Sequence, residues 1–153
     1  MDRWWAPLNG NIVLGCLTMM VGLTIHCVAF AFLLKFLFYL DRKEMIKTSV
    51  FAVSSLLVMV MIILMTVNLL QMSLWAGLFI ICGEFKSFEV AFYHSVVNFT
   101  SLGYGDIIMS EKRRLLGSLE AAYGVLMFGL TTSSIFMILQ NLMKRGLKEN
   151  DRL

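Results

Sequence analysis

The residues whose types and spacing suggest chemistry form one heptapeptide, Thr100-Ser101-Leu102-Gly103-Tyr104-Gly105-Asp106. Its two glycines alternate with larger residues, and glycine adopts positive φ without the steric cost of a Cβ. Consecutive carbonyl groups are therefore able to point the same way. A row of such carbonyls replaces the water shell of a potassium ion when four copies surround one axis. The spacing predicts an ion-coordinating loop, whereas an isolated Gly-x-Gly would indicate only a turn.

The composition is that of a membrane protein. The chain has 153 residues, of which 59% are hydrophobic and 15% are charged, and its mean hydropathy is +0.80. Soluble domains carry about 25% charged and about 45–50% apolar residues. The net charge of +3 is too small to indicate nucleic-acid binding. Cys16, Cys27 and Cys82 match no metal-ligand spacing and are interpreted as buried free thiols.

The loop must be positioned by membrane-length helices, because three apolar segments exceed the roughly 20 residues that cross a bilayer. We expect them at residues 11–40, 48–82 and 115–143, giving an all-α membrane protein. An interfacial lead with Trp4 and Trp5 precedes the first segment, and a charged loop ends at residue 47. A short charged tail, residues 144–153, follows the third. No cleavable signal peptide is expected, because the first segment exceeds the roughly 7–15 apolar residues of one.

Polar residues inside these segments are expected to join helices to one another. His26 is interpreted as bonded to a neighbouring helix, with a proton-sensing role as the alternative. Asn68 and Gln71 are expected to make interhelix hydrogen bonds. No segment repeats Arg or Lys at every third position, so an arginine-rich voltage sensor is not expected.

A short helix is expected at residues 87–99, directly before the heptapeptide. Ser87 is expected to cap it, and Glu89 lies in its favourable first turn. Its twelve helical residues reach about 18 Å at about 1.5 Å per residue, which is too short to cross a bilayer. We interpret it as a re-entrant pore helix whose return path is the heptapeptide. Non-helical backbone at membrane depth is tolerated only inside protein or along a water-filled path.

The heptapeptide resembles the selectivity filter of potassium channels, whose usual form is Thr-Val-Gly-Tyr-Gly-Asp. The last four residues, from Gly103 to Asp106, match this form, whereas Ser101 and Leu102 replace the usual Thr and Val. The resemblance implies that carbonyls from Ser101 to Tyr104, with the Ser101 hydroxyl, coordinate potassium ions. It also implies a homotetramer, because each chain carries one copy of the filter.

The third apolar segment resembles the inner helix of bacterial two-transmembrane potassium channels, in which Arg-Leu opens the helix and a hinge glycine follows. Here Arg114-Leu115 precedes Gly124, which the resemblance makes the hinge. The aromatic stretch at residues 91–96 resembles the pore helix of the same family. The resemblance covers roughly residues 51–143 and places the pore domain at residues 48–153. The helix within residues 1–47 is an addition to this plan.

The resemblance implies supporting roles beside the filter. Asp106 is expected at the outer mouth, bonded to Tyr93 or His94. Val97 occupies a position at which some relatives carry a carboxylate, so that Asp106 lacks that partner here.

Glu120 is the one carboxylate well inside the third segment, where a charge costs about 2.5–3.5 kcal/mol. It lies roughly 140° around the helix from Val125, and we expect it behind the filter. Its candidate hydrogen-bond partners are Tyr93, Ser95, Gln71 and Trp75, and a pH-sensing role is the alternative.

Five residues of the third segment recur at three- or four-residue intervals and share one helix face: Val125, Phe128, Thr132, Phe136 and Gln140. The resemblance implies that this face lines the pore cavity, with Phe136 or Gln140 near an inner constriction. Ordinary helix packing is the alternative.

The function implied by the resemblance is passive potassium conduction by a homotetramer in the plasma (inner) membrane. The N-terminus is expected outside and the C-terminus in the cytoplasm. Membrane lipids and permeating potassium ions are the expected partners, with no cofactor and no nucleic acid. The alternatives are a weakly selective cation channel, an ion-driven transporter, and a non-conducting scaffold or sensor. An enzyme is not expected, because no nucleophile–base or metal constellation appears.

Overall fold

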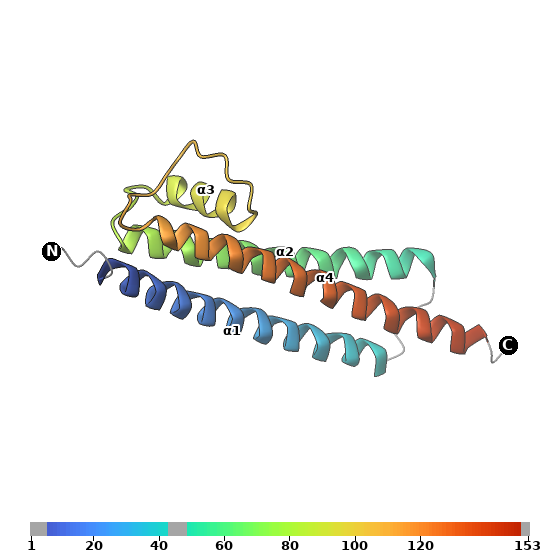
Figure 1. Ribbon diagram of the computed structural model, residues 1–153. Helices are drawn as coiled ribbons and strands as arrows, with labels where there is room; N and C mark the ends of the chain where they lie inside the picture. Colours follow the sequence, from blue (N-terminus) through green and yellow to red (C-terminus); the bar gives the residue numbers. More distant parts are fainter. Residues whose placement is uncertain (1–5, 43–48, 151–153) are drawn as a thin grey trace.

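The computed structural model describes residues 6–42 and 49–150, and over these residues it contains four helices (Figure 1). They are α1 (Ala6–Arg42), α2 (Val50–Ile81), α3 (Phe88–Phe99) and α4 (Arg114–Asn150). The three long helices run beside one another, and the short α3 lies beside α2 and α4 at one end. Trp4, Trp5 and residues 43–48 of the expected charged loop lie outside the described residues.

Three of these helices are long and apolar enough to cross a membrane, at Gly10–Leu40, Val50–Ile81 and Arg114–Lys144. The expectation of three spans in an all-helical chain is confirmed. Many large apolar side chains of the three helices are exposed in the single chain, including Phe32, Phe51 and Ile62. Such a surface is stable against lipid or other apolar helices, which is consistent with a multi-pass membrane protein.

The chain turns from α2 into α3 through a Schellman motif at Gly83. The Glu84 amide donates to the Phe79 carbonyl at 3.0 Å, and the Gly83 amide donates to the Ile80 carbonyl at 2.8 Å. Gly83 has φ +77°, which glycine adopts without strain. This tight turn returns the chain beside α2 and so places α3 against it.

The helix α3 begins and ends at the expected residues, and Ser87 is its N-cap residue as expected, but without the side-chain hydrogen bond of a cap. Ser87 occupies the N-cap position with extended backbone, and its side chain makes no capping hydrogen bond. Its carbonyl accepts the first helical bond, from the Ala91 amide at 3.1 Å. The backbone geometry of an N-cap therefore forms without the side-chain contact that usually stabilises it.

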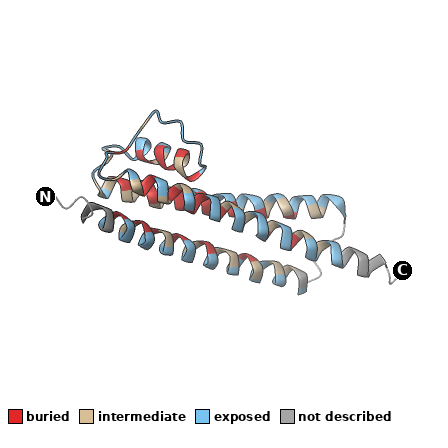
Figure 2. Ribbon diagram, in the orientation of Figure 1, coloured by how far each residue is buried: buried red, intermediate tan, exposed pale blue. Residues whose placement is uncertain are grey.

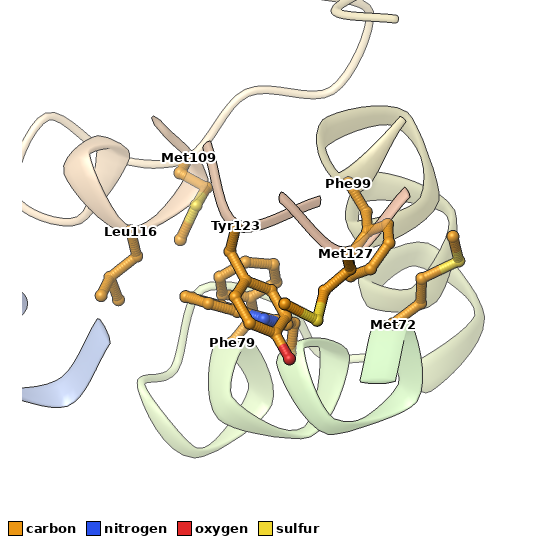
Figure 3. Packing of buried hydrophobic residues seen from close by; sticks show 8 residues of the cluster. Met72, Phe79, Phe99, Met109, Leu116, Tyr123 and Met127 are labelled. Atoms are coloured by element: carbon orange, nitrogen blue, oxygen red, sulfur yellow. The ribbon is translucent and has the colours of Figure 1, made fainter. Parts of the chain in front are cut away.

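The main core lies where α3 packs against α2 and α4, and there the buried residues gather (Figure 2). Trp75 makes tilted ring contacts with Phe79 of α2 and with Tyr123 of α4, and Phe99 of α3 meets Tyr123 edge to face. Figure 3 shows Phe99, Tyr123 and Met127 packed together above α2. Each fully buried large side chain contributes about 1.5–3 kcal/mol. This core fixes the end of α3 from which the heptapeptide departs.

The cysteine interpretation is corrected by the structure. Cys16 and Cys27 are exposed on α1, and Cys82 is half-buried after α2. All three are free thiols, as expected, but they are not buried. Apolar sequence surroundings do not decide which face of a membrane helix packs inside the protein.

The helix α1 is held against α2 and α4 by polar contacts as well as apolar ones. Asn11 donates to the Lys112 carbonyl at 2.6 Å and accepts from the Arg113 side chain at 2.9 Å. Deeper in the molecule, the Gln71 amide donates to His26 Nδ1 at 3.2 Å. The expected bond between His26 and a neighbouring helix is confirmed.

Gln71 and Asn68 make the interhelix bonds expected of them. Gln71 Oε1 accepts from the Tyr123 hydroxyl at 2.8 Å, and the Asn68 amide donates to Thr131 Oγ1 at 3.3 Å. His26, Gln71 and Tyr123 thus form one buried hydrogen-bonded chain across α1, α2 and α4.

Candidate functional site

The heptapeptide leaves α3 as non-helical backbone with an alternating conformation. Ser101, Gly103 and Gly105 have φ of 58°, 60° and 73°, whereas Leu102 and Tyr104 between them have negative φ. Alternation between left- and right-handed φ turns successive peptide planes so that their carbonyls lie on one side and their amides on the other. Positive φ at alternate residues is therefore compatible with a row of carbonyls on one side of the chain.

The amides on one side of this row bond to the end of α3. The Leu102 and Gly103 amides both donate to the Val97 carbonyl, at 2.9 and 3.3 Å. The Ser101 amide donates to the Asn98 carbonyl at 2.7 Å. The last turn of α3 therefore anchors the inner half of the heptapeptide by its amide side.

The carbonyls on the other side have no partner within the described residues. Among those residues, no donor bonds to the carbonyl oxygens of residues 101–105. The same residues are exposed in the single chain. Backbone carbonyls rarely remain unpaired where water is excluded, so a row of them is a site for water or a cation.

Ser101 is the one residue besides glycine with positive φ among the described residues. A left-handed conformation costs about 1–2 kcal/mol for a residue with a Cβ. Such strain persists only where the surrounding contacts impose it, and it gathers at functional sites. The strained residue here is the first of the predicted coordinating residues.

The outer end of the heptapeptide is held by Tyr93, whose hydroxyl donates to Asp106 Oδ2 at 2.6 Å. This bond is the main cause that lowers the pKa of Asp106 and raises the pKa of Tyr93. Asp106 therefore stays ionised at neutral pH and places a negative charge at the end of the carbonyl row.

His94 does not bond Asp106. It instead bonds the carbonyl of Ile107, the residue that follows Asp106. Its Nδ1 lies 3.0 Å from the Ile107 carbonyl, and its Nε2 lies 2.8 Å from the Asn98 amide nitrogen. A carbonyl only accepts, so Nδ1 carries the proton and Nε2 accepts from Asn98. Burial is the main cause that lowers the pKa of His94, which favours this neutral form.

A second contact, which the sequence analysis missed, joins the loop between the heptapeptide and α4 to the short link that follows α2. Glu84 accepts from the Ser110 amide at 2.8 Å and from the Ser110 hydroxyl at 2.7 Å. The available signal was a carboxylate in the very short link between the second apolar segment and the pore helix. Nothing in the sequence pointed to Ser110 as its partner.

Gly124 lies against the backbone at the end of α3. A Cβ built on Gly124 would overlap the Phe99 carbonyl oxygen and lie 2.7 Å from the carbonyl carbon. The α4 helix continues through this position without a break. The absence of a side chain at Gly124 thus permits α4 to support the residue directly before the heptapeptide.

Glu120 is fully buried and lies behind the heptapeptide, against α3. Of its four expected partners, Ser95 makes the contact, with Ser95 Oγ 2.5 Å from Glu120 Oε1. Tyr93 bonds Asp106 and Gln71 bonds Tyr123, so those two side chains are engaged elsewhere. The indole nitrogen of Trp75 has no partner among the described residues.

The five residues expected on one face of α4 lie largely outside the core of the single chain. Four of them are exposed: Val125, Thr132, Phe136 and Gln140. Phe128 is half-buried and makes an edge-to-face contact with Phe99 at 5.5 Å. This face of α4 is therefore available to line a cavity or to contact another chain.

A pocket of about 560 Å³ opens behind the heptapeptide, between α3 and the first turns of α4. Gly103 and Gly105 line it from one side and Val97 from another, together with Arg114 and Gly117. Val97 is the position at which the sequence analysis noted that a carboxylate is missing. Its short apolar side chain leaves the pocket unfilled.

Comparison with protein families matches residues 68–141 to the ion channel family model. The matched region runs from the second half of α2 through α3 and the heptapeptide into α4, and it leaves out α1. The match supports an ion channel family. Neither the comparison with curated proteins nor that with solved structures found a match.

Proposed function

We propose that four copies of this chain form a potassium-selective channel that conducts passively across the membrane. The observation that carries the proposal is the unpaired row of carbonyls at residues 101–105, with positive φ at alternate residues. One chain supplies one such row, and four rows around an axis surround an ion with oxygen atoms on all sides. The potassium-channel form of the heptapeptide and the ion channel family match support the same function.

In the proposed pore, carbonyls from Ser101 to Tyr104, with the Ser101 hydroxyl, form successive ion sites. Each site replaces the water shell of a potassium ion and releases the ion when the next one enters. The ionised Asp106 attracts cations to the outer mouth. The bonds from the heptapeptide amides to α3 keep the carbonyls pointed toward the axis without further ordering when an ion binds.

We further propose that α3 is a re-entrant pore helix and that the exposed face of α4 lines the cavity. Thr132 and Gln140 would place polar groups along that face, and Phe136 would narrow it. The N-terminus is then outside and the C-terminus is in the cytoplasm, in the plasma (inner) membrane. Gly124 as a hinge stays a prediction within this proposal.

A weakly selective cation channel is the second candidate, and Leu102 is the observation that favours it. Leu102 replaces the usual Val, and its side chain is 53% exposed in the single chain. A larger side chain behind the ion sites is able to change the spacing of the carbonyls, and potassium selectivity depends on that spacing or on carbonyl field strength. A non-conducting scaffold is a third candidate, and it predicts a tetramer without flux.

The test is ion flux from liposomes that hold the purified chain, with potassium and sodium gradients and with barium as a blocker. Gly103→Ala should abolish selective potassium flux, because its φ of +60° strains any side chain there. Gly83→Ala is the matched control, since Gly83 also has positive φ and open space around it but lies outside the heptapeptide. Equal potassium and sodium flux in the wild type would favour the second candidate. Selective potassium flux that survives Gly103→Ala would refute the role of the carbonyl row.

A further inference from the structure

Ser95 of α3 contacts both α2 and α4 behind the heptapeptide. Its hydroxyl oxygen lies 2.8 Å from the Met72 carbonyl of α2 and 2.5 Å from Glu120 Oε1 of α4. Ser95 and Glu120 are both 0% exposed. Both distances are within hydrogen-bond range, so an ionised Glu120 would leave one serine hydrogen to serve two acceptors.

The two contacts of Ser95 favour one protonation state of Glu120. A serine hydroxyl has one hydrogen to donate, and a carbonyl oxygen only accepts. When Glu120 is protonated, Ser95 donates to Met72 and the carboxyl group donates to Ser95, so that each contact has a hydrogen of its own. We infer that Glu120 works as a neutral carboxylic acid, a hydrogen-bond donor that positions the pore helix.

The groups around Glu120 agree with a neutral acid. On α2, Val50–Ile81 contains no titratable residue. On α3, His94 directly precedes Ser95; it is neutral and bonds the Ile107 carbonyl and the Asn98 side chain. On α4, the Tyr123 hydroxyl donates to the Gln71 side chain, and the Gln71 side-chain amide donates to His26 of α1.

No positive charge compensates the carboxyl group. Among the described residues, no Lys or Arg bonds Glu120, and its Oε2 has no hydrogen-bond partner. The side-chain amide of Asn98 is the other polar group that interacts with the carboxyl group of Glu120. An ionised carboxylate buried without a cation costs several kcal/mol, far more than the neutral acid.

The consequence concerns the ion path and rests on the proposed function. The neutral acid of Glu120 on α4 donates a hydrogen bond to Ser95 of α3. The hydrogen of the Ser95 hydroxyl is then free to bond the Met72 carbonyl of α2. Two residues after Ser95 on α3, the Val97 carbonyl accepts from the Leu102 and Gly103 amides. Ionisation of Glu120 would remove one donor, so either the bond to Met72 or the contact to Glu120 is lost. Glu120 is thus a positioning residue that acts only while it is protonated.

Infrared spectroscopy of the folded tetramer tests the protonation directly, whether or not the protein conducts. Wild-type protein with isotope-labelled glutamate should show, at neutral pH, an isotope-shifted carbonyl stretch of a protonated carboxylic acid. The band should be absent from Glu120→Gln and should remain in Glu89→Gln, where the same change is made at an exposed residue of α3. Absence of the band from the labelled wild type would overturn the inference, even if Glu120→Gln failed to fold.

Potassium flux across a range of pH tests the positioning role. Glutamine keeps an N–H that donates to Ser95 at every pH, so Glu120→Gln should conduct like the wild type at neutral pH. The wild type should lose potassium flux as the pH rises and Glu120 ionises. Glu120→Gln should keep its flux over the same pH range. Glu89→Gln should show the same pH dependence as the wild type. Identical profiles for the wild type and Glu120→Gln would overturn the positioning role. A folded wild type without flux at any pH would count against the proposed channel, and the infrared band would still decide the protonation.

Discussion

Replacing Gly124 by alanine tests how closely α4 must approach the end of α3. The added Cβ would overlap the Phe99 carbonyl oxygen, and it would also lie 2.9 Å from the Phe99 Cα. These are backbone atoms of the last residue of α3, so no side-chain rotation relieves the overlap. Either α4 moves away from α3 or the residue before the heptapeptide shifts.

Two opposing effects set the size of the change. Alanine favours a helix over glycine by about 1 kcal/mol. Overpacking a filled site costs about 1–3 kcal/mol, and a rigid backbone neighbour places the cost at the upper end. The net expectation is a loss of about 2 kcal/mol per chain. Because Phe99 precedes the carbonyl row directly, a fall in potassium selectivity should accompany the loss of stability.

The free energy of unfolding in detergent and the reversal potential under potassium and sodium gradients measure these two effects. Gly129→Ala is the matched control, because its Cβ would meet nothing within 4 Å in the chain. That variant should be as stable as the wild type or more stable. If Gly124→Ala matches Gly129→Ala in stability and keeps its selectivity, the packing argument is refuted. An altered open probability with unchanged stability and selectivity would instead support the predicted hinge at Gly124.

Three further predictions follow from the contacts around the pore region. Tyr123→Phe should cost about 1–3 kcal/mol in unfolding free energy, because the buried Gln71 oxygen loses its donor while the ring contacts remain; unchanged stability would show that this bond contributes nothing. Glu84→Ala should speed hydrogen exchange at the Ser110 amide, which loses its acceptor, and exchange at the wild-type rate would contradict this contact. Asn11→Ala should weaken the attachment of α1 to the loop before α4, seen as faster proteolysis near the start of α1; an unchanged cleavage rate would argue that apolar packing alone holds α1.

Much of the fold was predictable from local pattern. Lipid accepts only helices and closed barrels, in which every backbone group is satisfied, and apolar segments of about 30 residues have the length of helices. The twelve-residue helix α3 followed from its length and from the turn residues on either side. Side-chain exposure was harder to predict, as Cys16 and Cys27 show. A membrane helix is apolar on all sides, so its sequence does not identify the packed face.

In the candidate site, too, some features could be predicted from the local sequence. The alternate glycines at 103 and 105 predict the carbonyl row, because backbone conformation there depends on the absence of a Cβ. The expectation that Glu120 lies behind the row followed from the angle between helix positions. Both arguments use only the chemistry of a short stretch of chain.

The pairing of polar groups was decided by tertiary structure alone. The sequence named four donors for Glu120, and only the packing of α3 between α2 and α4 selected Ser95 and gave it Met72 as a second acceptor. The bond between Glu84 and Ser110 and the contact of Gly124 with Phe99 likewise join residues far apart in the chain. Local sequence determines what a segment is able to form, whereas the partner of a buried polar group depends on which helices meet and at what depth. That choice belongs to the whole packed chain, because one shift of a helix changes every such pair together.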